Sequence, residues 1–306
     1  MNVLIAADME GIAGIDDAGD CLPSHPAAYA RGRRLMTDEV LVAIDALRAG
    51  GVERISVGDW HMVGTNVERE RMPDGVEVRP IADLALTADD PSITAAAGGG
   101  KLDAVVLLGH HASTPNPRAF CSHTFIWEME VLLDGESLSE VRTYAQALAA
   151  ERIPVLVCSG DRWMLEELRD GELGSARLLA TKEGQGRGRA VSRPLATTRV
   201  ELAEAIREAI AGPLEPPPVR SYPAELRVIA EGEELIATTV SEPADLLRTI
   251  ATVFRSSAVS KEYRQLAQLL PSGHDSALRR VHRRLGSLLA TPVMRSKERR
   301  WLAAAP

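Results

Sequence analysis

The stretch Met1-Asn-Val-Leu-Ile-Ala-Ala-Asp8-Met-Glu10-Gly11 predicts a short apolar strand that ends in two carboxylates. Side chains alternate across a strand, so Asp8 and Glu10 are expected to project together from its carboxyl end. In open α/β sheets, ligands bind at this end. Two acidic groups held side by side repel each other unless a cation or a shared proton lies between them. A simpler alternative is a helix-capping carboxylate followed by a turn at Gly11.

Strand and helix patterns alternate along the chain after this first strand. A long loop rich in glycine and aspartate, 11–26, precedes apolar residues at helical spacing over 29–49, and Gly50-Gly51 marks the helix end. Further strands are predicted at 52–57, 76–81, 102–108, 153–158 and 176–180, and further helices at 140–150, 163–168 and 197–211. Alternation with short connections favours parallel strands. We therefore predict an α/β fold with a mostly parallel sheet and helices on both faces.

Changes in composition divide the chain into three predicted parts. The proline-rich stretch 212–218 is typical of a stiff linker, and it would divide an α/β metal-binding catalytic domain, 1–212, from a smaller α+β domain, 213–270. Residues 271–306 are rich in arginine and predict a basic amphipathic helical tail. Such a tail either docks on an acidic body or contacts a membrane surface or nucleic acid.

Composition restricts the classes of partner. The net charge of -8 over 306 residues argues against nucleic acid as the main partner, and 4% aromatic content disfavours base-stacking surfaces. Cys21, Cys121 and Cys158 have no C-x-x-C spacing, so neither a disulfide framework nor a thiolate zinc site is expected. The N-terminus has no basic region and only a short apolar run, which predicts neither a signal peptide nor a membrane span and favours a cytoplasmic protein.

Polar groups follow three of the predicted strands. Asp8 and Glu10 end the first, His61 follows the second, and His110-His111 follows the strand 102–108. A single histidine at a strand end is more often structural, but carboxylates and imidazoles together are the ligands of zinc and related ions. One carboxylate can also bridge two metal ions. Spacing does not choose between His110 and His111, since no compact motif such as H-E-x-x-H is present.

The sequence resembles a known family in the motifs that carry these residues. These motifs are Asp8-Met-Glu-Gly-Ile-Ala-Gly14, Arg31-Gly-Arg-Arg-Leu-Met-Thr-Asp-Glu39, Gly58-Asp-Trp-His61, Gly109-His-His-Ala112 and Cys121-Ser-His-Thr124. In this combination they are similar to the DppA-like D-aminopeptidases, a family of zinc metallopeptidases. The resemblance covers roughly residues 1–255, so the basic tail lies outside it.

The resemblance implies a site with two zinc ions per subunit. Its ligands would be Asp8, Glu10, His61, His111 and Glu140. Asp8 would bridge the ions, with Glu10 and His61 on one and His111 and Glu140 on the other. His123 matches the catalytic histidine of the family, and His110 would be a neighbour of the ligands. The family also implies short peptides with D-amino acids as substrates, and a ring-shaped homo-oligomer, a pentamer or decamer.

Several further residues are candidates for supporting roles. Arg142 and Tyr144 stand where the family pattern has glycine and asparagine, and would lie near the second metal or line the substrate site. Asp59 is either a partner that orients His61 or a turn carboxylate. Lys182 and Arg187, in a predicted glycine-rich loop over 182–189, would bind a substrate carboxylate; the loop lacks the context of a dinucleotide fingerprint.

Three functions are compatible with the sequence. The first is a zinc-dependent aminopeptidase that hydrolyses the N-terminal amide bond of short peptides with a metal-activated water. The second is a metal-dependent amidohydrolase that acts on another small amide in a biosynthetic pathway. The departures from the family pattern at Arg142 and Tyr144 motivate this alternative. The third is a catalytically silent binding or scaffold protein, which the set of acidic and histidine ligands disfavours because buried unpaired carboxylates are costly.

Overall fold

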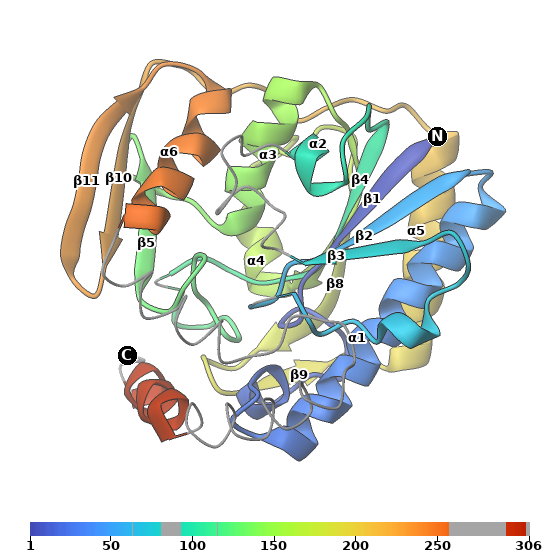
Figure 1. Ribbon diagram of the computed structural model, residues 1–306, viewed down its shortest axis with the longest axis horizontal. Coiled ribbons are helices and arrows are strands. Elements are labelled where there is room, and N and C mark those ends of the chain that lie inside the picture. The colour runs from blue at the N-terminus through green and yellow to red at the C-terminus, as the bar shows by residue number, and fades with distance from the viewer. Residues whose placement is uncertain (63, 81–92, 115, 257–291, 304–306) are drawn as a thin grey trace, which may run out of the picture.

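A seven-stranded sheet forms the centre of the computed structural model, which describes residues 1–62, 64–80, 93–114, 116–256 and 292–303 (Figure 1). Its strands are β1 Asn2–Ala7, β2 Arg54–Asp59, β3 Glu77–Pro80, β4 Ala104–His110, β7 Val155–Asp161, β8 Arg177–Gly184 and β9 Ala190–Ser192. Their order is β3-β2-β1-β4-β7-β8-β9, and all neighbours are parallel except β8 and β9. The predicted mostly parallel α/β sheet is confirmed.

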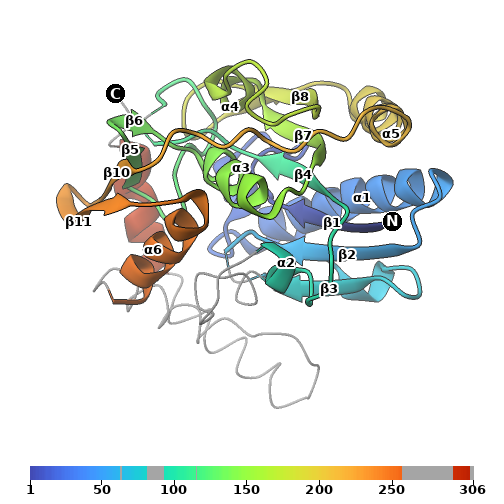
Figure 2. The ribbon, with the colours of Figure 1, turned by 90° about the horizontal axis from the view of Figure 1, so that it is seen from above.

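Helices cover both faces of this sheet, as predicted (Figure 2). They are α1 Pro26–Ala49 and α5 Leu195–Ala211 on one face, and α2 Ile93–Ala96, α3 Glu140–Glu151 and α4 Arg162–Glu167 on the other; two 3-10 turns, η1 Ala18–Cys21 and η2 Arg69–Arg71, lie in loops. In β1, Val3 and Ile5 pack with α1 and α5, whereas Leu4 packs with α3. This alternation explains why the strand is apolar throughout.

The register of the sheet sets the position of the polar strand ends. Ala7 of β1 pairs with Asp59 of β2 and with Leu108 of β4. The residues that follow these three positions therefore emerge at one level of one edge. The sheet thus brings together groups that are about 50 residues apart in the sequence.

Some element boundaries differ from those predicted. Helix α1 begins at Pro26 rather than residue 29, because the fixed φ of proline suits the first turn of a helix. Strand β8 extends to Gly184, so Lys182 lies in a strand and not in the predicted glycine-rich loop. The short antiparallel strand β9 was not predicted, since three residues give too little pattern.

A second sheet lies beside the first. It contains β5 Met129–Leu133, β6 Glu136–Ser137, β10 Ala224–Ala230 and β11 Glu233–Val240, all antiparallel in the order β11-β10-β5-β6, and α6 Pro243–Ser256 covers it. A tight turn at Asp134 and Gly135, both with positive φ, joins β5 to β6. The small α+β unit expected from 213–270 therefore shares its sheet with strands from the earlier part of the chain.

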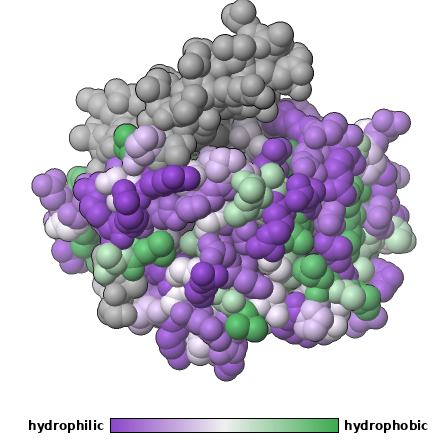
Figure 3. All heavy atoms as spheres, turned by 90° about the horizontal axis from the view of Figure 1, so that it is seen from below, coloured by the Kyte–Doolittle hydropathy of each residue, from purple (hydrophilic) through white to green (hydrophobic). Residues whose placement is uncertain are grey.

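The last described segment is a helix over 292–303. The rest of the predicted basic amphipathic tail, 271–291 and 304–306, lies outside the described residues. No helix in the described part of the chain is long and apolar enough to cross a membrane. The face seen from below is mainly hydrophilic where residues are described, with apolar side chains scattered over it (Figure 3).

Candidate metal centre

The five predicted metal ligands come together at the carboxyl edge of the large sheet. Asp8 and Glu10 follow β1, His61 follows β2, and His111 follows β4. Glu140 is the first residue of α3. Ser139 caps the N-terminus of this helix, because its side chain accepts a hydrogen bond from the Arg142 amide. All five side chains are buried. Buried carboxylates need a compensating positive charge, which is what a metal ion supplies.

The carboxylate of Asp8 lies between two acid–histidine pairs. Its Oδ1 is 3.5 Å from His61 Nδ1, and that nitrogen is 3.1 Å from Glu10 Oε2. Its Oδ2 is 3.3 Å from His111 Nε2, which is 3.5 Å from Glu140 Oε1. Each oxygen of Asp8 therefore faces a different pair. This is the arrangement expected of a carboxylate that bridges two cations.

The backbone orients both histidine rings. His61 Nε2 donates to the carbonyl of Cys21 over 2.8 Å, and His111 Nδ1 donates to the carbonyl of Ala112 over 3.0 Å. These bonds fix a proton on the nitrogen that faces away from Asp8, so the other nitrogen of each ring is the one directed at the carboxylates. Metal-binding histidines commonly donate their outer N–H to a carbonyl in this way.

The electrostatics of the cluster favour bound positive charge. Burial raises the pKa of Asp8, but hydrogen bonds with His111 and His61 outweigh it and hold that pKa well below its usual value. The pKa of Glu140 is lowered in the same way by His111. Burial lowers the pKa of His61 and His111, yet the adjacent carboxylates raise both well above the usual value. The carboxylates of Asp8 and Glu140 thus stay ionised and attract cations.

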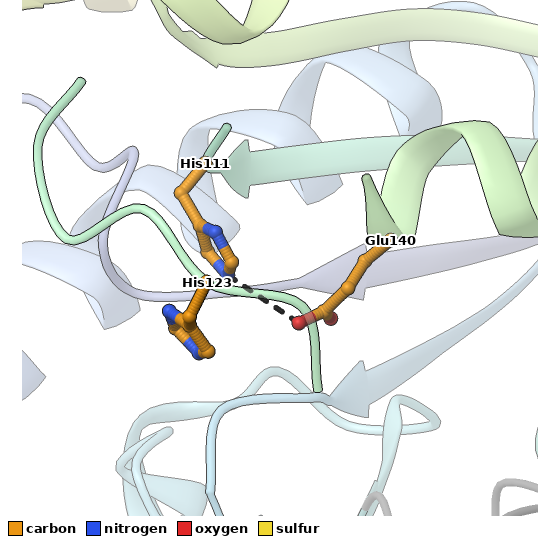
Figure 4. A group of neighbouring side chains, drawn as sticks. All are labelled: His111, His123 and Glu140. Carbon is orange, nitrogen blue, oxygen red and sulfur yellow. Dashed lines mark ion pairs between the residues drawn. The ribbon is translucent and has the colours of Figure 1, made fainter. Parts of the chain in front are cut away.

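His123 stands beside one half of the cluster. Its ring stacks on that of His111 with centroids 4.0 Å apart (Figure 4). Its Nδ1 donates to the Cys121 carbonyl over 2.7 Å. Ligand atoms of His111, His123 and Glu140 lie within 4.8 Å of one another. Burial, and then the charge of His111, lower the pKa of His123, which favours a neutral ring whose Nε2 is free to take up a proton.

Tyr144 supports the Glu140 carboxylate. Its hydroxyl donates to Glu140 Oε2 over 3.1 Å, while the amide of Phe125 donates to Oε1 over 2.7 Å. The Tyr144 ring packs against Trp60 and His110 with centroids 4.6 Å and 6.1 Å apart. The structure thus places Tyr144 beside the second acid–histidine pair, as predicted, and adds the Phe125 amide, which no side-chain pattern reveals.

Asp59 and His110 support the cluster without joining it. Asp59 accepts hydrogen bonds from the amides of Asn66 and Val67 and from the Asn66 side chain, which itself donates to the His61 carbonyl. Asp59 therefore fixes the backbone of His61 and does not bond its ring. The His110 ring packs edge-on to Trp60, and its Nδ1 is 3.8 Å from Asp8 Oδ2.

Arg142 and Lys182 lie in other environments than those expected. The Arg142 guanidinium turns away to Glu136 and Glu172, with Nε 2.9 Å from Glu172 Oε1. Lys182 is buried and donates from Nζ to the carbonyls of Glu10 and Ile15. Lys182 thus holds the backbone of the loop that follows β1, whereas Arg142 is paired with acidic side chains.

Glu39 is a buried residue that the residue pattern did not single out. Its Oε2 accepts a hydrogen bond from the Ala13 amide over 3.2 Å, in the loop that follows Glu10. Burial raises the pKa of Glu39 to about 7. The motif 31–39 contains it, but only the fold shows that this helix residue supports the loop that follows Glu10.

Comparison with known proteins identifies the family of this fold and site. A family model described as D-aminopeptidase matches residues 1–264. The chain belongs to the D-aminopeptidase family. This confirms the resemblance found in the sequence motifs, and the matched region contains every predicted metal ligand and His123.

Two comparisons, one of sequence and one of structure, relate this member of the D-aminopeptidase family to D-aminopeptidases of Bacillus subtilis. The D-aminopeptidase of Bacillus subtilis (strain 168) is 26% identical over 162 residues, which are 53% of this chain and 56% of that protein. The alignment thus spans only about half the length of the relative. A solved structure is described as the Zn-dependent D-aminopeptidase DppA from Bacillus subtilis, a self-compartmentalizing protease; at 18% identity it has a TM-score of 0.69 and covers 84% of this chain and 99% of its own. It confirms the fold.

Proposed function

We propose that this chain is a zinc-dependent aminopeptidase that removes the N-terminal residue from short peptides containing D-amino acids. The observation that carries the proposal is the division of the two Asp8 oxygens between two acid–histidine pairs. Family membership supports the reaction class, and the names of both relatives support D-amino acids as the substrate type. Zinc-dependence is named for the structural relative.

The donors of the cluster fit two zinc ions. Glu10 and His61 would hold one, His111 and Glu140 would hold the other, and Asp8 would be shared. Imidazole nitrogen and carboxylate oxygen are ligands that zinc prefers, and the outer N–H of each histidine is already bonded to a carbonyl. Zinc bound there would polarise the substrate carbonyl and lower the pKa of a bound water towards neutrality.

His123 is the catalytic residue in this proposal. Its neutral ring, fixed through Nδ1 by the Cys121 carbonyl, presents Nε2 to the cluster and would carry a proton between the attacking water and the leaving amine. A substrate held at the metal beside His123 is positioned for attack at its first amide bond.

A second candidate keeps the metal cluster and changes the substrate. Tyr144 replaces the asparagine of the family pattern and lies against Glu140, so another small amide is the natural alternative. A silent scaffold protein is less consistent with the cluster, because burying several carboxylates and histidines together is costly for a protein that binds nothing there.

The assembly is also a proposal. The structural relative is described as self-compartmentalizing, and we infer that this chain likewise forms a ring-shaped homo-oligomer, a pentamer or decamer, with the sites facing an inner space. Mass measurement of the purified protein in solution tests this. A monomer at micromolar concentration would refute it.

Metal analysis combined with release assays tests the proposed function. The purified protein is analysed for zinc and then assayed on matched D- and L-aminoacyl amides. Bound zinc with selective release from the D-series supports the aminopeptidase. Zinc without release from either series favours the second candidate, and a protein with neither metal nor activity refutes both enzymes.

A further inference from the structure

The helix over 292–303 docks on loops that support the histidines of the cluster. It lies beyond residue 264, where the family match ends. Figure 1 shows it beside the segment that leads into α1. We propose that this C-terminal helix is a clamp that positions His61 and His123, so that Glu298 and Trp301 are positioning residues for the reaction; this rests on the proposed function.

One end of the clamp holds the loop behind His61. Glu298 Oε1 is 2.9 Å from His25 Nε2, and Glu298 Oε2 accepts a hydrogen bond from the Ser24 hydroxyl over 3.3 Å. Arg295 donates from Nη2 to the Ser24 carbonyl over 3.0 Å. This loop includes Cys21, whose carbonyl accepts the outer N–H of His61. The helix therefore restrains the loop that orients this ligand ring.

The other end of the clamp holds the loop of His123. The Trp301 ring stacks on that of Trp127, with centroids 5.1 Å apart and an interplanar angle of 10°. The Trp301 carbonyl accepts a hydrogen bond from Arg187 Nη1 over 2.8 Å. The carbonyl of Arg187 in turn accepts a hydrogen bond from the Cys121 amide over 3.1 Å. The carbonyl of Cys121 accepts the hydrogen bond that orients the His123 ring. Trp301 is thus joined to the His123 loop from both sides.

Arg187 shows that this docking is part of the fold. Its side chain is buried, and burial lowers its pKa. Within the described residues it forms no ion pair; its guanidinium donates to the Trp301 carbonyl and lies over the Trp301 ring, with its carbon 5.6 Å from the ring centroid, and the charge of Glu128 offsets part of the burial. Removing this support would leave a buried guanidinium without its acceptor, which is unfavourable. A helix resting loosely on the surface would have no such effect.

The two ends of the clamp predict two separable defects. Trp301→Ala loosens the loop of His123, and a displacement of about 1 Å at a catalytic group lowers turnover by up to roughly 100-fold. We expect a fall in kcat of about tenfold or more, with KM and zinc content unchanged. Glu298→Ala loosens the loop of Cys21, and loss of such indirect support of a ligand weakens metal affinity about tenfold or more.

The experiment compares these variants in the full-length zinc-loaded protein. Zinc affinity is measured by competition with a chromophoric chelator. The values of kcat and KM are measured on an aminoacyl amide well below the melting temperature. Docking of the helix is followed by the near-ultraviolet circular dichroism of the stacked Trp127–Trp301 pair. Arg299→Ala and Arg300→Ala, exposed on the same helix, are the matched controls and should leave all values unchanged.

The outcomes separate this proposal from the proposed function. If Trp301→Ala abolishes the tryptophan signal while kcat stays within twofold, and Glu298→Ala leaves zinc affinity within twofold, the clamp is refuted and the helix only adds stability. Should Trp301→Ala fail to fold, Trp301→Phe weakens the same stack, and an unchanged kcat there is equally contradictory. A wild-type protein that binds zinc but releases no amine refutes the proposed function, whereas the zinc-affinity comparison still decides the clamp.

Discussion

Removing the Tyr144 hydroxyl is the most informative single change near the cluster. Tyr144→Phe deletes the hydrogen bond to Glu140 Oε2 and keeps the ring, so its packing on Trp60 and His110 is retained. The residue is fully buried, so its hydroxyl is out of contact with bulk water. Any effect of this substitution therefore reports on the carboxylate that Tyr144 contacts.

The expected loss of zinc affinity follows from the strength of the hydrogen bond between Tyr144 and Glu140. A buried hydrogen bond to a charged group contributes roughly 1.5–3 kcal/mol. At about 1.4 kcal/mol for each factor of ten, this is on the order of a 10- to 150-fold loss of zinc affinity at the position held by His111 and Glu140. Indirect partners of metal ligands commonly have effects of about 10- to 100-fold, in the same range.

Chelator competition on the metal-free protein measures this effect. The account predicts that one of two binding steps weakens while the step at Glu10 and His61 is unchanged, and that turnover at limiting zinc falls in parallel. Tyr222→Phe is the matched control, since that hydroxyl lies 3.4 Å from Gln146 and touches no metal ligand. Equal affinities for Tyr144→Phe and the wild type would refute the role given to this hydroxyl.

Three more predictions concern the cluster and its surroundings. His123→Ala should reduce turnover by about 100-fold or more and leave zinc content intact; full activity in this variant would exclude His123 as the proton carrier. Zinc removal by a chelator should lower the melting temperature, because a ligand that binds only the folded state stabilises it, and an unchanged melting curve would argue against a resident metal. Glu39 keeps its proton when folded up to a pH of about 7 but loses it near 4.5 when unfolded, so its contribution to stability, present below pH 4.5, is lost as pH rises to about 7. Relative to Glu39→Gln, the wild type should thus lose about 3 kcal/mol of unfolding free energy over this range, and parallel pH curves for the two proteins would contradict the assignment.

The sheet was predictable because its strands are buried on both faces. Residues 102–108 and 153–158 are nearly all apolar. Such runs, when they alternate with helical patterns, strongly favour a parallel sheet. The second sheet was predicted only in part. Its pairing of β10 with β5 joins Leu226 to Leu133 across more than 90 residues, and local patterns carry no information about such partners.

The cluster was predictable in its members and less so in its surroundings. Asp8, Glu10 and His61 follow strands, so the sheet register alone brings them together. Glu140, at the start of a helix, came only from the resemblance to a known family. The orientation of Arg142 was not predictable, because the acidic partner Glu172 approaches it from a distant loop. Backbone groups such as the Cys21 carbonyl leave no trace in the sequence.

The central claim is that two metal ions share Asp8. Diffraction data collected at the zinc absorption edge from crystals of the active protein test this claim most directly. We expect two anomalous peaks, one beside Glu10 and His61 and one beside His111 and Glu140, with the Asp8 carboxylate between them. A single peak in fully active protein, or two peaks away from Asp8, would contradict it.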